Sequence, residues 1–299
     1  MGLYKYPSPP YEEEPMTKIA VITDSDSSLP AALADKYGIR QVPITIHFDD
    51  ESYTTGVDID DRRLFDKVDR KKKLPTTAAP SPGAFSAAYH AAFESGADEI
   101  VCICVSSLMS STYSSAVTAC EEFPGRRIVV MDSLNISMGQ GFMALQAANM
   151  SSQGKSIDEI LAALQAMSKR ISLFAVLPTL KYLAMSGRVG KFVAGMADTL
   201  NIKPILTVTD GKLVLLERIR TRTRAIERML NLTAEAVGGK SVEQLAVIHV
   251  NDLDGARELE KLLRETIQCP AEVLTLEFTP GLSVHAGSGV VGLVVLTAE

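Results

Sequence analysis

The amino-acid sequence predicts an α/β fold of two domains, in which a mostly parallel, Rossmann-like sheet domain precedes a mixed α/β domain. Apolar runs alternate with helical patterns along the chain, and this alternation is typical of α/β proteins. Three early apolar runs end in hydroxyl-rich turns, which indicates parallel strands with their carboxyl ends at one edge of the sheet. The 299 residues, 46% hydrophobic and 22% charged, suffice for two globular domains.

In the first domain, strands are predicted at 18–23, 99–107 and 127–132. A helix begins near Ser81, which can cap it, and Pro82 suits its first turn. Its apolar stripe consists of Phe85, Tyr89 and Phe93. Further helices are predicted at 110–123 and from residue 137. Residues 1–15 are rich in Pro, Glu and Tyr and are expected to be a disordered leader.

The pattern changes near residue 150, so the domains are predicted at 16–150 and 151–299. Ser156 and Glu159 form a capping box. Asp210-Gly211 indicates a β-hairpin turn. The remaining elements are helical patterns at 179–185, 190–200, 223–237 and 256–267, and strands at 245–250, 272–278 and 289–296.

Bulk composition excludes several classes of protein. The net charge of −6 argues against nucleic acid as a partner, and the one basic run, 70–73, is expected in a surface loop. Four cysteines are too few for a disulfide scaffold, and Cys102 and Cys104 are expected to be buried on one face of a strand. We expect no metal site, no cofactor and no stable membrane insertion. A cytoplasmic location, which is reducing, fits the small number of scattered cysteines.

The segment from Val101 to Val117 joins a dry strand to a dense group of hydroxyls. Eight hydroxyl side chains lie within the ten residues that follow the apolar strand, namely Ser106, Ser107, Ser110, Ser111, Thr112, Tyr113, Ser114 and Ser115. Hydroxyls and free amides at the start of a helix bind anions without a cationic side chain. Helix capping uses the same residue types but accounts for only one or two of them. We therefore expect a site for an anion or a polar head group.

Three other segments carry candidate site residues. Thr76 and Thr77 precede the Pro82 helix and are expected near the same sheet edge. His285 is expected in a glycine-rich turn, where the backbone can approach a ligand closely. Arg188 stands between two glycines in a predicted loop. From the residues alone, His285 and Arg188 are as well explained by a structural turn and an ordinary surface arginine.

Six segments in order resemble the motifs of the DegV family: VITDSDSSLP, PTTAAPSPGAF, SSLMSSTYSSA, DSLNISMGQGF, LKYLAMSGRVGK and SVHAGSGVVGL. The resemblance runs from about Lys18 to the carboxyl terminus. It implies a two-domain α/β protein with a long-chain fatty acid in a buried tunnel between or beneath the domains. It also implies, from some bacterial members, a binding subunit that presents the acyl carboxylate to a separate kinase subunit for acyl-phosphate formation.

The resemblance assigns roles residue by residue. Thr77 and Ser110 resemble the residues that share the carboxylate, Ser25 falls in the turn beside the site, and His285 resembles the histidine near the head group. Arg188 resembles the arginine linked to the kinase partner or the phosphorylated state. Ser111, a further ligand contact, stands where the family has glycine. The family's Ser-Gln after the threonine is Ala78-Ala79 here, and a motif proline is Ser288.

Other functions remain open at this point. Ser110 and His285 could form a hydrolase pair oriented by Asp24 or Asp132, acting on a lipid or small ester, although the sequence has no G-x-S-x-G elbow. A nucleotide-binding subunit would need a phosphate-binding loop such as G-x-x-x-x-G-K-[ST], which the sequence lacks. A structural module is the third alternative, with the alternating arginines from 218 to 224 contacting an acidic partner.

Overall fold

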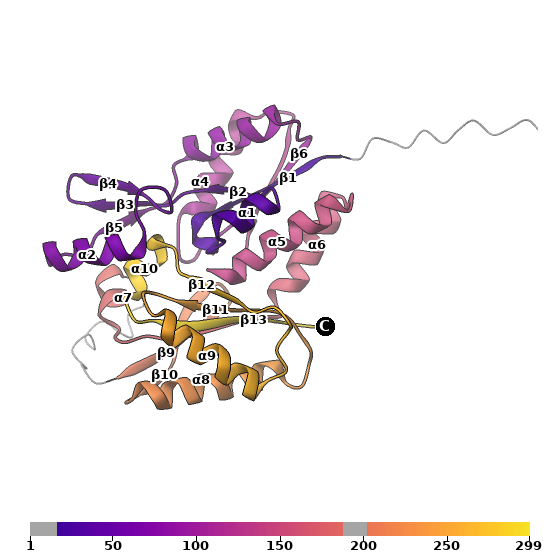
Figure 1. Cartoon of the computed structure of the whole chain (residues 1–299). Helices are drawn as coiled ribbons and strands as arrows, with labels where there is room; N and C mark the ends of the chain where they lie inside the picture. The colour runs from indigo at the N-terminus through magenta and orange to yellow at the C-terminus, as the bar shows by residue number, and fades with distance from the viewer. Residues whose placement is uncertain (1–16, 188–201) are drawn as a thin grey trace, which may run out of the picture.

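The computed structural model describes residues 17–187 and 202–299, and two sheets dominate it (Figure 1). An upper half holds a four-stranded sheet and a lower half holds a six-stranded sheet. The predicted leader, Arg188 and the helical pattern at 190–200 lie outside the described residues. The predicted α/β class, with a parallel sheet followed by a mixed one, is confirmed. The boundary at residue 150 falls within a helix and stays a prediction.

The N-terminal sheet is wholly parallel, in the order β2-β1-β6-β7. Alternating side chains bury both of its faces. Ile22 and Cys102 pack with α3 and α4, while Val21 and Ile103 pack with α5. The elements of this half are β1 (Ile19–Asp24), α1 (Ala31–Lys36), β2 (Arg40–Val42), α3 (Pro82–Glu94), β6 (Glu99–Cys104), α4 (Thr112–Ala119), β7 (Arg127–Asp132), α5 (Met138–Ser152) and α6 (Ile157–Ser168), with 3-10 turns at Ser25–Ser27 and Cys120–Glu122.

The C-terminal sheet is mixed, in the order β10-β9-β8-β13-β11-β12, and only β11 and β12 pair in parallel. Phe174 and Val176 pack under α8, whereas Leu173 and Ala175 face the upper half. The elements are β8 (Ile171–Val176), α7 (Lys181–Ser186), β9 (Lys203–Thr209), β10 (Lys212–Ile219), α8 (Arg222–Val237), β11 (Val242–His249), α9 (Leu253–Thr266), β12 (Leu274–Glu277), α10 (Pro280–Ala286) and β13 (Val291–Thr297).

A small third sheet, absent from the sequence prediction, lies beside the N-terminal sheet. It consists of β3 (Thr45–Phe48), β4 (Glu51–Thr54) and β5 (Thr76–Ala78), in the order β4-β3-β5, with α2 (Asp61–Lys71) packed against it. Strands of three or four residues give too little alternation to be recognised in a sequence. The register pairs Ile46 with Thr77, so this sheet holds a predicted site residue.

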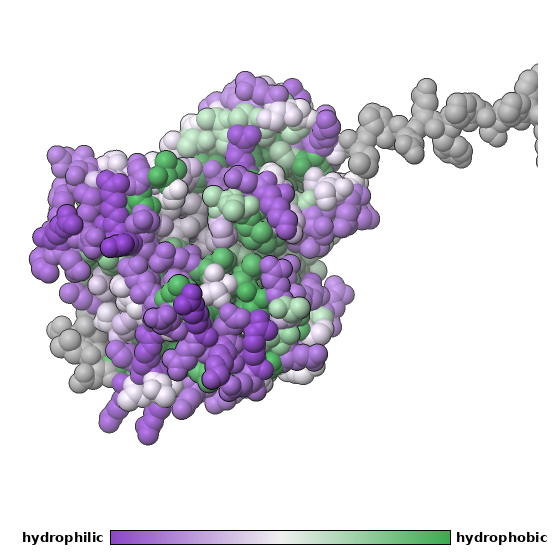
Figure 2. Space-filling model, in the orientation of Figure 1, coloured by the Kyte–Doolittle hydropathy of each residue, from purple (hydrophilic) through white to green (hydrophobic). Residues whose placement is uncertain are grey.

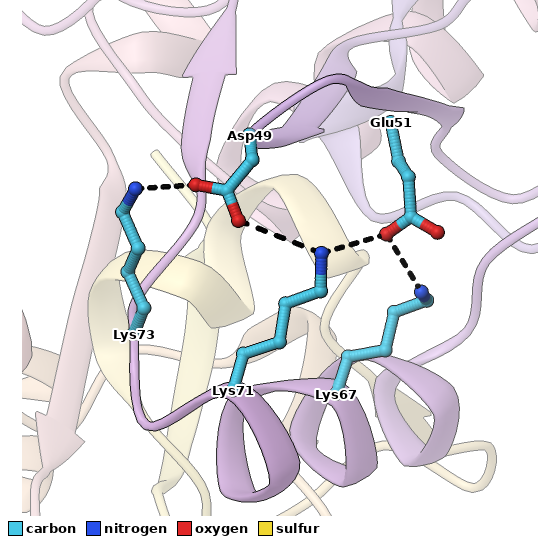
Figure 3. Close-up of polar contacts among 5 residues, drawn as sticks. All are labelled: Asp49, Glu51, Lys67, Lys71 and Lys73. Carbon is cyan, nitrogen blue, oxygen red and sulfur yellow. Dashed lines mark hydrogen bonds and ion pairs between the residues drawn. The ribbon is translucent and has the colours of Figure 1, made fainter.

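Four ion pairs tie α2, and Lys73 just after it, to the β3–β4 hairpin (Figure 3). Lys71 Nζ lies 2.9 Å from Glu51 Oε2 and 3.5 Å from Asp49 Oδ2, and Lys67 Nζ lies 3.1 Å from Glu51 Oε2. Lys73 pairs with Asp49. The two lysines that contact Glu51 hold the pKa of its carboxyl down to about 2. Hydrophilic residues cover this corner of the molecule (Figure 2).

Two local expectations were wrong. The basic run at 70–73 is not all loop, because Arg70 and Lys71 form the last turn of α2. The Asp60 carboxylate caps this helix by accepting from Arg63 N–H at 2.7 Å. His285 lies in α10 and not in a turn. Pro280 at the first helical position favours that helix. The glycines after residue 286 led to the prediction of a turn instead.

Several other local predictions are confirmed. Ser81 caps α3 by accepting from Ala84 N–H at 3.2 Å. Ser156 and Glu159 form the reciprocal capping box of α6. Asp210-Gly211 turns the hairpin between β9 and β10. Cys102 and Cys104 are fully buried on one face, with sulfurs 3.8 Å apart.

Candidate functional site

A cavity of about 1010 Å³ lies between the halves and takes wall residues from both of them. One part of the wall carries hydroxyls and the imidazole of His285, and another part is aliphatic. The polar wall residues are Asp26, Thr77, Ser81, Ser107, Ser110, Ser111, Ser115, Lys212 and His285. The larger apolar wall residues are Ile44, Val105, Leu108, Met109, Ile136, Leu173, Leu177, Leu183, Leu206, Leu213, Phe278, Leu282 and Val290.

Thr77 and His285 meet directly, although 208 positions separate them in the chain. Thr77 Oγ1 lies 2.9 Å from His285 Nε2. β5 supplies the threonine, and α10 supplies the histidine. Helix α10 contacts β3, β5, α2, α7 and the 3-10 turn after β1, so it fixes the histidine at the junction of these elements. The predicted neighbourhood of Thr77 and His285 is thus present in the fold.

The hydroxyls after β6 divide into two groups. Ser107, Ser110, Ser111 and Ser115 line the cavity. The other hydroxyls that make hydrogen bonds here support the chain: Ser106 Oγ donates to the Gly211 carbonyl at 2.7 Å, and Ser114 Oγ donates to the Ser111 carbonyl at 2.7 Å. Lining the cavity and supporting the chain are therefore divided between different residues of the loop after β6 and of α4. Whether the lining hydroxyls bind a ligand stays a prediction.

Ser110 is held in place by its own loop. Its N–H donates to the Ser106 carbonyl at 3.1 Å. Its Oγ accepts from Thr112 N–H at 3.3 Å and lies 2.8 Å from Thr112 Oγ1. A hydroxyl with two neighbouring donors can still rotate its proton toward a ligand. Ser110 can therefore act as a hydrogen-bond donor at the cavity wall.

A buried network fixes the strand ends beneath this loop. Asp24 Oδ2 accepts from Val105 N–H at 2.8 Å and from Gln140 Nε2 at 3.0 Å, and Gln140 also reaches Thr23 Oγ1 at 2.9 Å. Burial raises the pKa of Asp24 to about 6, although these hydrogen bonds lower it in part. The network joins β1, β6 and α5, and therefore positions the polar wall.

Ser25 does not line the cavity. Its Oγ accepts from Ile44 N–H at 2.9 Å, and Ile44 is a wall residue. Ser25 thus supports the wall and does not face the cavity, in contrast to Thr77, Ser110, Ser111 and His285. The structure gives no position for Arg188. The roles of all these residues toward a ligand stay predictions.

Most of the larger apolar wall residues come from the C-terminal half. Leu173 and Ala175 on β8 and Leu206 on β9 line the cavity, and each is at most 5% exposed. By contrast, Ser81, Ser107 and Ser111 at the polar part are exposed. The cavity therefore opens to solvent where hydroxyls line it and is dry where aliphatic side chains line it.

The hydrogen bonds of the described residues do not build a Ser-His-Asp relay. His285 Nε2 lies beside Thr77, while Ser110 Oγ lies beside Thr112. The Asp132 carboxylate accepts from Ser107 N–H at 3.2 Å and Leu134 N–H at 2.9 Å. The Asp24 carboxylate accepts from Val105 N–H and Gln140 Nε2. Both aspartates thus support loops at the ends of strands.

Two charged cavity residues were absent from the sequence prediction. Asp26 sits in the 3-10 turn after β1, and Lys212 opens β10. The hairpin turn beside Lys212 was recognisable, but its contact with the loop after β6 depends on how the halves pack. Within residues 17–187 and 202–299, no cluster of three or more His, Cys, Asp or Glu could hold a metal ion. No helix in those ranges is long and apolar enough to cross a membrane.

Solved structures of similar fold cover nearly the whole chain. One is the fatty-acid-binding DegV family protein of Thermus thermophilus, with a TM-score of 0.88 and 29% identity over 94% of this chain and 100% of that one. Another is a stearic acid-binding protein of Eubacterium ventriosum, with a TM-score of 0.86 and 26% identity over 94% of this chain and 98% of that one.

Sequence comparison agrees with the structural likeness. A DegV domain-containing protein of Streptomyces coelicolor is 34% identical over 277 residues, which cover 93% of this chain and 98% of the relative. The family model described as "Uncharacterised protein, DegV family" matches residues 18–298. This chain belongs to the DegV family.

Proposed function

We propose that this protein binds a long-chain fatty acid in the cavity between its halves. The observation that carries the proposal is the two-part wall: hydroxyls and an imidazole at the open end, and buried aliphatic side chains beyond them. A volume of about 1010 Å³ is at the upper end of the range for small-molecule sites, about 300–1,000 Å³. The similar structures from Thermus thermophilus and Eubacterium ventriosum, described as fatty-acid-binding, support this ligand class.

The tail would supply most of the affinity. Burying one methylene contributes about 0.8 kcal/mol, so about 14 of them contribute roughly 11 kcal/mol before the costs of association are subtracted. Leu173, Ala175 and Leu206 would contact the tail. Thr77, Ser110, Ser111 and His285 would orient the carboxylate.

The protein would present that carboxylate to a separate kinase subunit, which forms the acyl phosphate from ATP. Hydrogen bonds from neutral hydroxyls leave the carboxylate oxygens nucleophilic, whereas a bidentate arginine clamp would hold their charge. The exposure of Ser107 and Ser111 suits access by a partner. Arg188 is proposed, from the family resemblance alone, to contact the partner or the phosphorylated head group. An Arg188→Ala variant should retain the lipid and lose phosphorylation by the matching kinase.

The ligand is tested on protein purified from a host with a normal lipid pool. The protein is denatured and extracted with organic solvent, and the extract is identified by mass spectrometry beside that of a Thr77→Ala, Ser110→Ala variant. We expect a stoichiometric fatty acid in the wild type and less of it in the variant. An empty extract from folded wild-type protein contradicts the proposal. A covalent serine probe that labels Ser110 would favour the hydrolase alternative.

A further inference from the structure

The cavity wall contains one lysine among the described residues, and that lysine has no acidic partner there. Lys212 lines the cavity and is exposed. None of the ion pairs within residues 17–187 and 202–299 includes it, although lysines elsewhere pair with Asp49, Glu51 and Glu159. Among the described residues the wall also holds one carboxylate, that of Asp26. Because Lys212 forms no ion pair within those residues, its ammonium group is available to a ligand at the open part of the cavity.

The fold fixes where this lysine lies. The adjacent residue, Gly211, accepts a 2.7 Å hydrogen bond from Ser106 Oγ through its carbonyl. A Cβ added to Gly211 would lie 2.8 Å from Ser106 Oγ and 3.3 Å from Leu108 Cδ1, so the hairpin tip touches the loop after β6. Gly211 also has a φ of +75°, which favours glycine. This contact places Lys212 beside the loop that carries Ser110 and Ser111.

The hydroxyls and the imidazole cannot by themselves exclude a neutral lipid. A serine or threonine hydroxyl can donate to an alcohol or an ester as well as to a carboxylate, although more weakly, and neutral imidazole can donate or accept. Charge is what distinguishes an ionised acid, and a Coulomb interaction acts without direct contact. Lys212 supplies that charge.

We propose that Lys212 is a specificity-determining residue that makes the cavity prefer an ionised long-chain acid, or its acyl phosphate, over a neutral lipid of equal length. This inference rests on the proposed function, because it names the group that selects the ligand's charge. The acyl phosphate carries more negative charge than the acid, so the same lysine should retain it more strongly.

The test compares affinities for hexadecanoic acid and hexadecanol in delipidated protein at pH 7.5. Lys212→Gln should lose about three- to tenfold in affinity for the acid and keep the affinity for the alcohol. Lys212→Arg, which keeps the charge, should restore the preference. Lys261→Gln is the matched control, since Lys261 is exposed on α9, outside the cavity wall and outside the ion pairs of the described residues. Raising the salt concentration should narrow the difference between wild type and Lys212→Gln.

Two results would overturn the inference while leaving the proposed function intact. One is unchanged acid affinity in Lys212→Gln. The other is an equal loss for acid and alcohol, which would assign Lys212 to packing through its aliphatic stem. If the wild type binds neither lipid, both the inference and the proposed function fail. The wild-type measurement therefore separates the two.

Discussion

The two halves of the molecule contribute different proportions of polar and apolar groups to one cavity, and Lys212 and His285 are the polar wall residues of the lower half. The parallel sheet of the upper half contributes polar groups, because its strands end together and each end turns into a loop or helix. The mixed sheet of the lower half contributes aliphatic groups. Alternate residues of β8 lie on the sheet face opposite α8, and that face lines the cavity. Strand ends supply hydrogen-bond donors, and a sheet face supplies a dry surface. A ligand with an anionic head and a long tail needs both.

Blocking the aliphatic wall should have the largest effect. In an Ala175→Phe variant the new ring displaces about three or four methylenes of the tail, which at about 0.8 kcal/mol each weakens hexadecanoate binding about 100-fold. Calorimetric titration measures this, and decanoate should be affected less. Phe174→Leu, on the opposite face of the same strand, is the control and should alter stability without altering binding. Equal weakening for both chain lengths would contradict a tail that lies along β8.

The contact between the halves should depend on pH through Asp61. Ser283 of α10 donates to Asp61 Oδ2 at 2.6 Å, and Asp61 Oδ1 has no hydrogen-bond partner among the described residues. Burial, first, and then the nearby Glu277 and Asp60 raise the pKa of Asp61 to about 8. The folded protein then binds a proton that the unfolded chain releases above its pKa of about 4, so this carboxyl costs stability as pH rises from about 4 to 8.

An Asp61→Asn variant removes that dependence. We expect it to match the wild type near pH 4 and to be more stable by about 2 kcal/mol at pH 8, measured by urea unfolding at both pH values. The full shift in the pKa of Asp61 corresponds to a larger difference in stability, and relaxation of the site reduces that difference. Asp66→Asn, on the same helix, serves as the control. An Asp61→Asn variant less stable than the wild type at pH 8 would show that the carboxyl is ionised in the folded protein.

Removing one polar wall group should cost less than blocking the tail. Ser110→Ala loses one hydrogen bond to a charged head group, about 1.5 kcal/mol, which is roughly tenfold in affinity for hexadecanoate. Ser114→Ala is a matched control from α4, the helix that follows this loop, because Ser114 donates to the Ser111 carbonyl and lies outside the cavity wall. Competition with a fluorescent fatty acid reports both values. A larger effect of Ser114→Ala would remove Ser110 from the site.

The smallest effect is expected from the ion pairs between α2 and the β3–β4 hairpin. Solvent screens these exposed pairs, so a Lys67→Gln, Lys71→Gln variant should lower Tm by less than about 2 °C. Its fatty acid affinity should be unchanged, since the neighbouring β5 also pairs with β3 through backbone hydrogen bonds. Differential scanning calorimetry at low and high salt tests the first expectation. A large loss of binding would show that these pairs hold Thr77 in place.

The sequence allowed prediction of those features that have a local cause. The parallel sheet followed from apolar runs that end in hydroxyls, and the hairpin followed from Asp210-Gly211. Family resemblance implied that Thr77 and His285 both lie near the head group, and the structure brings them to 2.9 Å from each other. The third sheet was not predictable because its strands are short. The position of Lys212 in the cavity wall was not predictable either. It depends on a contact between Ser106 and Gly211, which are 105 positions apart in the chain.

The central claim is the direction of the ligand, with its head among the hydroxyls and its tail against β8. It is tested most directly by a crystal structure of the protein with an ω-bromo hexadecanoic acid, in which anomalous scattering locates the bromine. The account predicts the bromine near Leu173, Ala175 and Leu206, with the carboxylate between Thr77 and Ser110. A bromine beside Ser110, or a lipid bound outside the cavity, would contradict it.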